Sequence, residues 1–220
     1  MDLHAELGHR LDAFRHQLRG DLTAPIRACP GWTLHDLADH LGNENMWVTT
    51  AVREGHPDHQ RRAAPRDGLI EWFEGTCESI LDALAADPDA PAWTFYPPST
   101  VGFWLRRRTQ ETMMHLWDAE EALGEPTAFD TDLAVDGVSE VFDTFVPRQI
   151  ELGRITAPTA FRISSSDTGH TWSYGRGEPV AEITGPVRDL LLLLWKRIPE
   201  DHPSLTWNGD RSVLDTALVP

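Results

Sequence analysis

The chain of 220 residues has little cysteine, little positive charge and no long apolar run. Its two cysteines, Cys29 and Cys77, are too few for a disulfide framework or a structural zinc cage of thiolates. Nineteen Lys and Arg residues stand against 35 Asp and Glu residues, which gives a formal net charge of −16. Because such a surface repels phosphates and anionic headgroups, we expect neither nucleic acid nor membrane as a partner.

The longest apolar run, Leu190 to Trp195, is far shorter than the roughly 20 residues that cross a bilayer. The first turns of the chain are amphipathic and lack the cationic head and apolar run of a signal peptide. We therefore expect a soluble, cytoplasmic protein. With nucleic acids and membranes set aside, its expected partners are small molecules.

Apolar residues in the first part of the chain recur at three- and four-residue spacing, which predicts amphipathic helices. Thr33 and Asp36 stand at the N-cap and N3 positions of the second helix, the spacing of a capping box. Modest loops between the helices favour an antiparallel four-helix bundle. The predicted bundle helices span about residues 3–18, 33–55, 67–86 and 100–123, and a fifth helix, about 131–152, leads out of the bundle.

After Thr156 the pattern alternates with period two, which is typical of strands. Strands are expected around Phe161, around Trp172, over 179–184 and over 205–207, and helices over 187–198 and 210–218. The predicted fold class is therefore α+β, with a helical bundle over 1–155 and a small α/β domain over 156–220.

An acid four residues before a histidine occurs three times, as Asp12/His16, Asp36/His40 and Glu111/His115. Taken alone, each pair is most simply a surface ion pair. Context separates them, because His40, Glu111 and His115 border the apolar stripes of their helices and His16 has no comparable reason to join them. Helical bundles build metal sites from inward-projecting acids and histidines one turn apart.

We therefore expect His40, Glu111 and His115 to hold one divalent cation, most simply Zn²⁺, with Ni²⁺ or Fe²⁺ as alternatives. Three protein ligands leave a coordination position open, as in catalytic sites. Asp118, one turn beyond His115, is a candidate to orient that imidazole, and a surface acid is the plainer interpretation. Glu44, one turn past His40, is a candidate fourth ligand.

Two segments resemble a known family. Residues 29–42 read CPGWTLHDLADHLG and residues 107–120 read RRTQETMMHLWDAE. Both are similar to motifs of the mycothiol-dependent maleylpyruvate isomerase family, within the wider DinB-like metalloenzymes, and they occur in the same order. The resemblance covers essentially the whole chain and implies a DinB-like bundle followed by a small sterol-carrier-like α/β domain.

The resemblance implies the same three metal ligands, zinc as the usual ion, and mycothiol as thiol cofactor or co-substrate. The expected function is thiol transfer to, or cis–trans isomerisation of, a small electrophilic substrate. Arg107, Arg108 and Arg197 are candidates to bind its carboxylates, and ordinary surface pairing is the alternative. We expect a structural role for Cys29 and a monomeric chain. A non-enzymatic metal-binding regulatory or ligand-binding protein is the competing hypothesis.

Overall fold

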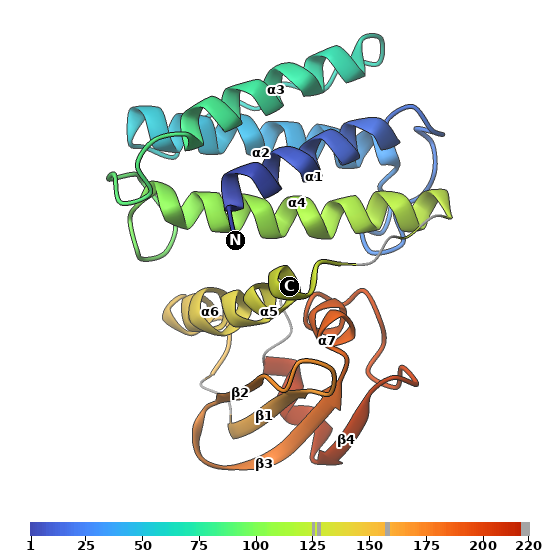
Figure 1. The fold of residues 1–220 in the computed structure, drawn as a ribbon, viewed down its shortest axis with the longest axis vertical. Coiled ribbons are helices and arrows are strands. Elements are labelled where there is room, and N and C mark those ends of the chain that lie inside the picture. The colour runs from blue at the N-terminus through green and yellow to red at the C-terminus, as the bar shows by residue number, and fades with distance from the viewer. Residues whose placement is uncertain (125, 127–128, 157–158, 217–220) are drawn as a thin grey trace. The chain divides into compact units, whose positions relative to one another are not determined.

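The computed structural model describes residues 1–124, 126, 129–156 and 159–216. The chain divides into two compact units, Met1–Thr127 and Ala128–Pro220. The first unit is helical and the second carries a four-stranded sheet, so the predicted α+β fold class is confirmed (Figure 1). Among the described residues, no helix combines the length and apolar character needed to cross a membrane.

The N-terminal unit is a bundle of four long helices. In this bundle α1 packs against α3 and α4, and α2 packs against the same two helices, so that α1 and α2 lie diagonally. The helices are α1 (Leu3–Gln17), α2 (Leu34–Glu54), α3 (Leu69–Leu84) and α4 (Val101–Leu123).

The helix directions differ in part from the predicted antiparallel arrangement. Helices α2 and α4 are antiparallel, as predicted, but α2 and α3 run in the same direction (Figure 1). Gly42 in the first half of α2 lies against Trp72 in the first turn of α3, and Arg53 near the end of α2 pairs with Asp82 near the end of α3. The connection 55–68 is long enough to return along the bundle, which allows the parallel pair.

This returning connection is fastened to α2 by side chains. Asn43 exchanges hydrogen bonds with the backbone of Arg62, donating to its carbonyl at 3.1 Å and accepting from its amide at 3.0 Å. Asp39 accepts from the amide of Ala64 at 2.6 Å and pairs with Arg61 at 2.9 Å. Residues 61–64 are therefore held in a defined position beside the middle of α2.

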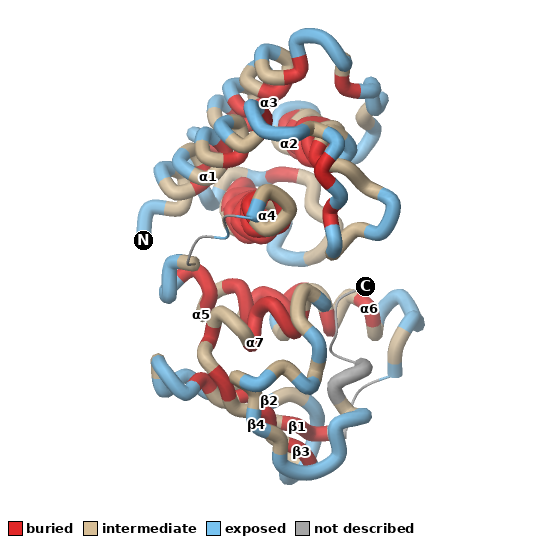
Figure 2. Tube along the Cα trace, turned by 90° about the vertical axis from the view of Figure 1, so that its right-hand side faces the viewer, coloured by how far each residue is buried: buried red, intermediate tan, exposed pale blue. Residues whose placement is uncertain are grey.

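The helix ends follow the sequence signals. Thr33 and Asp36 form the predicted capping box at the start of α2, and the Thr100 hydroxyl accepts from the amide of Phe103 at the start of α4. Gly124 ends α4 with a positive φ of 84°. Buried residues occur along α4 from Val101 to Glu120, and Figure 2, which looks along this helix, shows it mostly in the colour of buried residues. This helix can therefore carry polar side chains that are shielded from water.

The C-terminal unit begins with α5 (Thr131–Glu140), a π-helical turn η1 (Val141–Phe145) and α6 (Val146–Glu151). Its sheet has the order β2-β1-β3-β4, in which β1 and β3 are parallel and the other two pairs are antiparallel. The remaining elements are β1 (Thr159–Ser165), β2 (Thr171–Tyr174), β3 (Arg176–Gly185), α7 (Val187–Leu194), β4 (Thr206–Gly209) and a 3-10 helix η2 (Arg211–Thr216).

One face of this sheet is covered by helices. Phe161 and Ile163 are buried on that face, and the ring of Phe142 in η1 packs against Phe161. The division of the chain at residue 127 differs from the sequence-based boundary near 155, because α5 packs against α7 of the C-terminal unit. The predicted last helix, 210–218, is a 3-10 turn as far as residue 216, and 217–218 lie outside the described residues.

Candidate metal centre

Helices α2 and α4 bring His40, Glu111 and His115 together. One ligand atom of each lies within 4.8 Å of the other two. His40 Nε2 is 3.3 Å and His115 Nε2 is 4.0 Å from Oε1 of Glu111, and the two imidazole rings are 5.1 Å apart. Between 11% and 21% of each side chain is exposed, so the cluster is shielded but can be reached.

This donor set fits a divalent cation. Zinc bonds of roughly 2.1 Å to imidazole nitrogen and carboxylate oxygen place neighbouring tetrahedral ligand atoms about 3.4 Å apart. The His40–Glu111 separation of 3.3 Å matches that edge, and the 4.0 Å separation from His115 needs only a small inward shift. Two imidazoles and one carboxylate also suit nickel and iron.

The imidazole of His115 is oriented from behind. Its Nδ1 lies 3.0 Å from Oδ2 of Asp118, whose side chain is fully buried, so a proton on Nδ1 leaves the Nε2 lone pair facing the cluster. Burial lowers the pKa of His115, and Asp118 opposes that shift. The ring is therefore kept neutral near pH 7, as a metal ligand must be.

The Glu111 carboxylate is held ionised inside the bundle by two arginines and a hydrogen bond from His40. Burial alone would raise its pKa, but Arg108, His40 and Arg107 together hold the pKa well below its usual range. Arg108 donates to Oε2 of Glu111 at 2.7 Å, and Nε of Arg107 lies 3.8 Å from the same oxygen. Oε1 is the oxygen that faces the two imidazoles.

Two further groups lie close to the cluster. The ring of Trp32 packs against the ring of His40, with the ring centroids 5.2 Å apart. Burial, together with the charge of Glu111, raises the pKa of Glu44, while Arg108 opposes the shift. Glu44 is not a member of the group of three that the described residues form, so its role as a fourth ligand stays a prediction.

The other two acid and histidine pairs do not behave in this way. His16 is exposed on α1, and its neighbour Asp12 pairs with Arg15 instead. Asp36 is used in the capping box of α2 and leaves His40 to face α4. Of the three motifs, only Glu111/His115 therefore acts as a unit in this cluster.

The three arginine candidates differ in surroundings. Arg107 and Arg108 are 4% and 0% exposed, and both lie beside Glu111. Arg197 belongs to the C-terminal unit, follows α7 and donates to the carbonyl of Trp195 at 2.8 Å. Binding of a substrate carboxylate by any of them stays a prediction.

Sequence reasoning missed Asn45, a fully buried residue of α2. Its Oδ1 accepts from Arg108 at 2.9 Å, which links α2 to α4 beside the cluster. Asn45 lies between Leu41 and Val48 in the apolar stripe of its helix, and an amide in such a stripe is the signal that could have revealed it.

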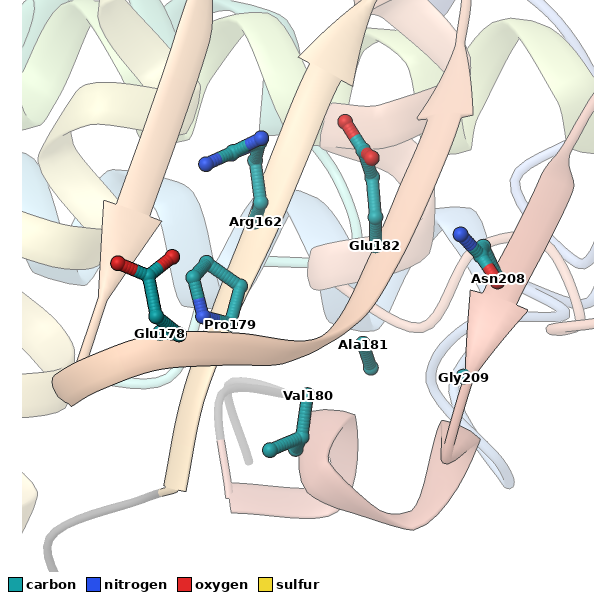
Figure 3. A pocket seen from close by; sticks show the side chains of 8 residues that line it. All are labelled: Arg162, Glu178, Pro179, Val180, Ala181, Glu182, Asn208 and Gly209. Carbon is teal, nitrogen blue, oxygen red and sulfur yellow. The ribbon is translucent and has the colours of Figure 1, made fainter.

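A shallow hollow of ≈ 170 Å³ lies on the sheet of the C-terminal unit. Arg162, Glu182 and Asn208 line it from neighbouring positions on β1, β3 and β4 (Figure 3). This hollow includes none of the residues that the sequence predicts for a site.

Together, the fold and the cluster define a class: helical-bundle proteins whose facing helices gather histidines and a carboxylate suited to a metal. Residues 4–120 match the mycothiol maleylpyruvate isomerase N-terminal domain, and residues 132–216 match the C-terminal domain of the same family. The chain therefore belongs to the mycothiol maleylpyruvate isomerase family.

Individual relatives extend the comparison. The uncharacterized protein Rv0036c of Mycobacterium tuberculosis is 27% identical over 223 residues, covering 89% of this chain and 84% of the relative. The uncharacterized protein Rv0738 of the same species is 28% identical over 135 residues, covering 57% and 69%. A crystal structure of the mycothiol-dependent maleylpyruvate isomerase shares the fold with a TM-score of 0.71 at 12% identity, covering 95% of this chain and 93% of that chain.

Proposed function

We propose that this protein is a metal-dependent enzyme that uses a low-molecular-weight thiol, mycothiol, as cofactor or co-substrate. Its reaction would be thiol transfer to a small electrophilic substrate, or cis–trans isomerisation of that substrate. The observation that carries the proposal is the convergence of His40, Glu111 and His115 from two helices, so that one ligand atom of each lies within 4.8 Å of the other two. Membership of the family supports the choice of thiol.

The residues of the cluster have separable roles. His40, Glu111 and His115 would hold the cation, with zinc as the first choice and nickel or iron as alternatives. A bound divalent cation supplies Lewis acidity and lowers the pKa of a coordinated thiol, so that a thiolate is available near neutral pH. Asp118 keeps the His115 ring in the required tautomer, and Trp32 covers one side of His40.

The chemistry of a thiolate explains both reaction types. A thiolate supplied by the bound thiol would be a nucleophile for an activated double bond. Addition, rotation about the former double bond and elimination of the same thiolate would give cis–trans isomerisation. Addition followed by protonation from solvent, without elimination, would give a thiol conjugate.

Metal analysis of the purified protein tests the site. We expect one equivalent of metal per chain in the parent and a loss of stoichiometric metal in His40→Ala and His115→Ala. His16→Ala is the matched control, because His16 also follows an acid by four residues but is exposed on α1. Equal metal content in all four proteins would contradict the proposed centre.

Turnover distinguishes an enzyme from the competing metal-binding regulatory or ligand-binding protein. The metal-loaded parent is incubated with mycothiol and a panel of small unsaturated acids that have a cis double bond, and products are followed by absorbance and mass. We expect isomerisation or conjugation that is lost in His115→Ala. Stoichiometric metal without any thiol-dependent turnover would favour the non-enzymatic alternative. Cytoplasmic location and a monomeric state stay predictions.

A further inference from the structure

Arg108 carries a charge that is completely enclosed in the bundle. Its side chain is 0% exposed, although it belongs to a run of three arginines at positions 106–108. A guanidinium in this position is expensive to bury unless its donors meet acceptors. Both terminal nitrogens of Arg108 do so, whereas its Nε has no partner among the described residues. The partners that it meets therefore indicate what the residue is for.

The guanidinium divides its donors between the two helices that form the cluster. It donates to Oε2 of Glu111 on its own helix at 2.7 Å and to Oδ1 of Asn45 on α2 at 2.9 Å. The Asn45 amide is itself oriented, because its Nδ2 donates to the Thr76 hydroxyl at 3.3 Å. A chain of hydrogen bonds thus runs from α3 through α2 to the Glu111 carboxylate.

This arrangement uses the two oxygens of Glu111 differently. Oε2 is occupied by the guanidinium, whereas Oε1 faces His40 and His115. A charge-assisted hydrogen bond uses one of the two lone pairs of Oε2 and orients the carboxylate, so Oε1 is the oxygen most readily offered to a cation.

We propose that Arg108 and Asn45 are positioning residues that hold Glu111 as a monodentate metal ligand. The inference rests on the metal centre proposed above. By occupying Oε2, Arg108 keeps open a coordination position that a bidentate carboxylate would fill. The open position favours binding of an anionic thiolate beside Glu111.

The competing interpretation is that Arg108 only ties α2 to α4. A structural tie affects the stability of the protein without metal, whereas a positioning residue also changes how metal is bound. Cobalt(II) reports this difference directly, because its visible absorption weakens when its coordination number rises above four. The metal alone, as Zn²⁺ or Co²⁺, is therefore a sufficient probe.

Two variants test the hydrogen-bonded bridge from Asn45 through Arg108 to Glu111. Arg108→Lys alters its centre and Asn45→Ala removes its α2 end. Lysine keeps the charge but lacks the planar fork that serves two acceptors at once. Thr49→Val is the matched control, since the buried Thr49 hydroxyl donates to the backbone carbonyl of Asn45 and not to its side chain. Each variant is first checked for folding by urea unfolding without metal.

We expect both bridge variants to bind zinc about tenfold to 100-fold more weakly in competition with a chelator. Their cobalt forms should show weaker visible absorption and a second Glu111 oxygen in X-ray absorption fine structure. Thr49→Val should lose stability while keeping the affinity and cobalt spectrum of the parent. If Asn45→Ala or a folded Arg108→Lys keeps the parent spectrum and affinity, Arg108 is a structural tie and the inference is overturned.

The proposed metal centre fails by a different result. A parent protein that binds no stoichiometric metal, or a His40→Ala variant that binds as tightly as the parent, would overturn the centre and the positioning role together. Stoichiometric metal lost in His40→Ala, with unaltered bridge variants, would overturn only the positioning role.

Discussion

Replacing Asp118 measures how much the carboxylate behind His115 contributes to metal binding. In Asp118→Asn the side chain keeps an oxygen that can accept from Nδ1 of His115 but loses its charge. In Asp118→Ala both the acceptor and the charge are lost. We expect the metal affinity to fall in the order parent, Asn variant, Ala variant.

The structure sets the size of the effect. Asp118 is fully buried and 3.0 Å from the imidazole, so water cannot replace it readily. Partners of metal-ligating histidines are typically worth about tenfold to 100-fold in affinity, which is about 1.4 to 2.7 kcal/mol. We assign the lower value to the Asn variant, which keeps the tautomer, and the upper value to the Ala variant.

These affinities can be measured as stability. At a metal concentration 100 times the dissociation constant of the parent, binding raises the free energy of unfolding by about 2.7 kcal/mol. The same concentration would give about 1.4 kcal/mol in the Asn variant and about 0.4 kcal/mol in the Ala variant. The increment is the difference between urea unfolding with and without metal, so any change in the metal-free protein cancels.

Asp12→Asn is the control, because Asp12 is an exposed acid on α1 that lies one turn from a histidine, His16, outside the cluster. It should keep the full increment. An Asp118→Ala variant with the same metal increment as the parent would refute the role assigned to this carboxylate.

Three further predictions concern stability and thiol chemistry. Gly42→Ala would place a Cβ 2.4 Å from the Trp72 ring. Overpacking costs about 1–3 kcal/mol and outweighs the helix-propensity gain of about 1 kcal/mol. Urea unfolding should therefore show a loss of stability of up to about 2 kcal/mol, and a gain would contradict this. Hydrogen bonds from Thr33 lower the pKa of Asp36 below 3.8. The contribution of the Asp36 carboxylate to stability is therefore complete at neutral pH and is lost as the pH falls through its folded-state pKa. The loss of stability in Asp36→Asn, measured by urea unfolding, should shrink at acid pH, and a constant loss between pH 7 and pH 3 would refute the reasoning. A thiol reagent should label the half-buried Cys29 in the native protein and both cysteines only in urea, because burial raises the pKa of Cys77 to about 12; two fast thiols in the native protein would contradict this.

Sequence periodicity could predict the central cluster because helix geometry is local. His40, Glu111 and His115 each border an apolar stripe, and a stripe fixes which side of a helix faces its neighbour. The antiparallel contact of α2 with α4 then brings the three positions together. The capping box at Thr33 was predictable for the same reason, since it depends on a spacing of three residues.

Long-range features could not be predicted in this way. The run of arginines at 106–108 looks like a solvated surface, and only tertiary structure shows that Arg108 is fully buried against Asn45. The parallel pair of α2 and α3 depends on where the connection 55–68 attaches, which periodicity does not encode. The π-helical turn Val141–Phe145 shifts the face of the predicted helix 131–152 by an extra residue, so a uniform period could not describe it.

The connection between α2 and α3 contains one stretch that is bonded to α2 and one that only spans the gap between the helices. Residues 61–64 are bonded to Asp39 and Asn43, which flank His40 on the same helix, whereas residues 58–60 are largely exposed. Extra residues near 58–60 would therefore lengthen the chain at little cost, since closure entropy grows slowly with loop length. The same insertion within 61–64 would disturb the turn of α2 that carries His40. A chain break or an inserted tag should therefore be placed at residues 58–60, before the bonded stretch.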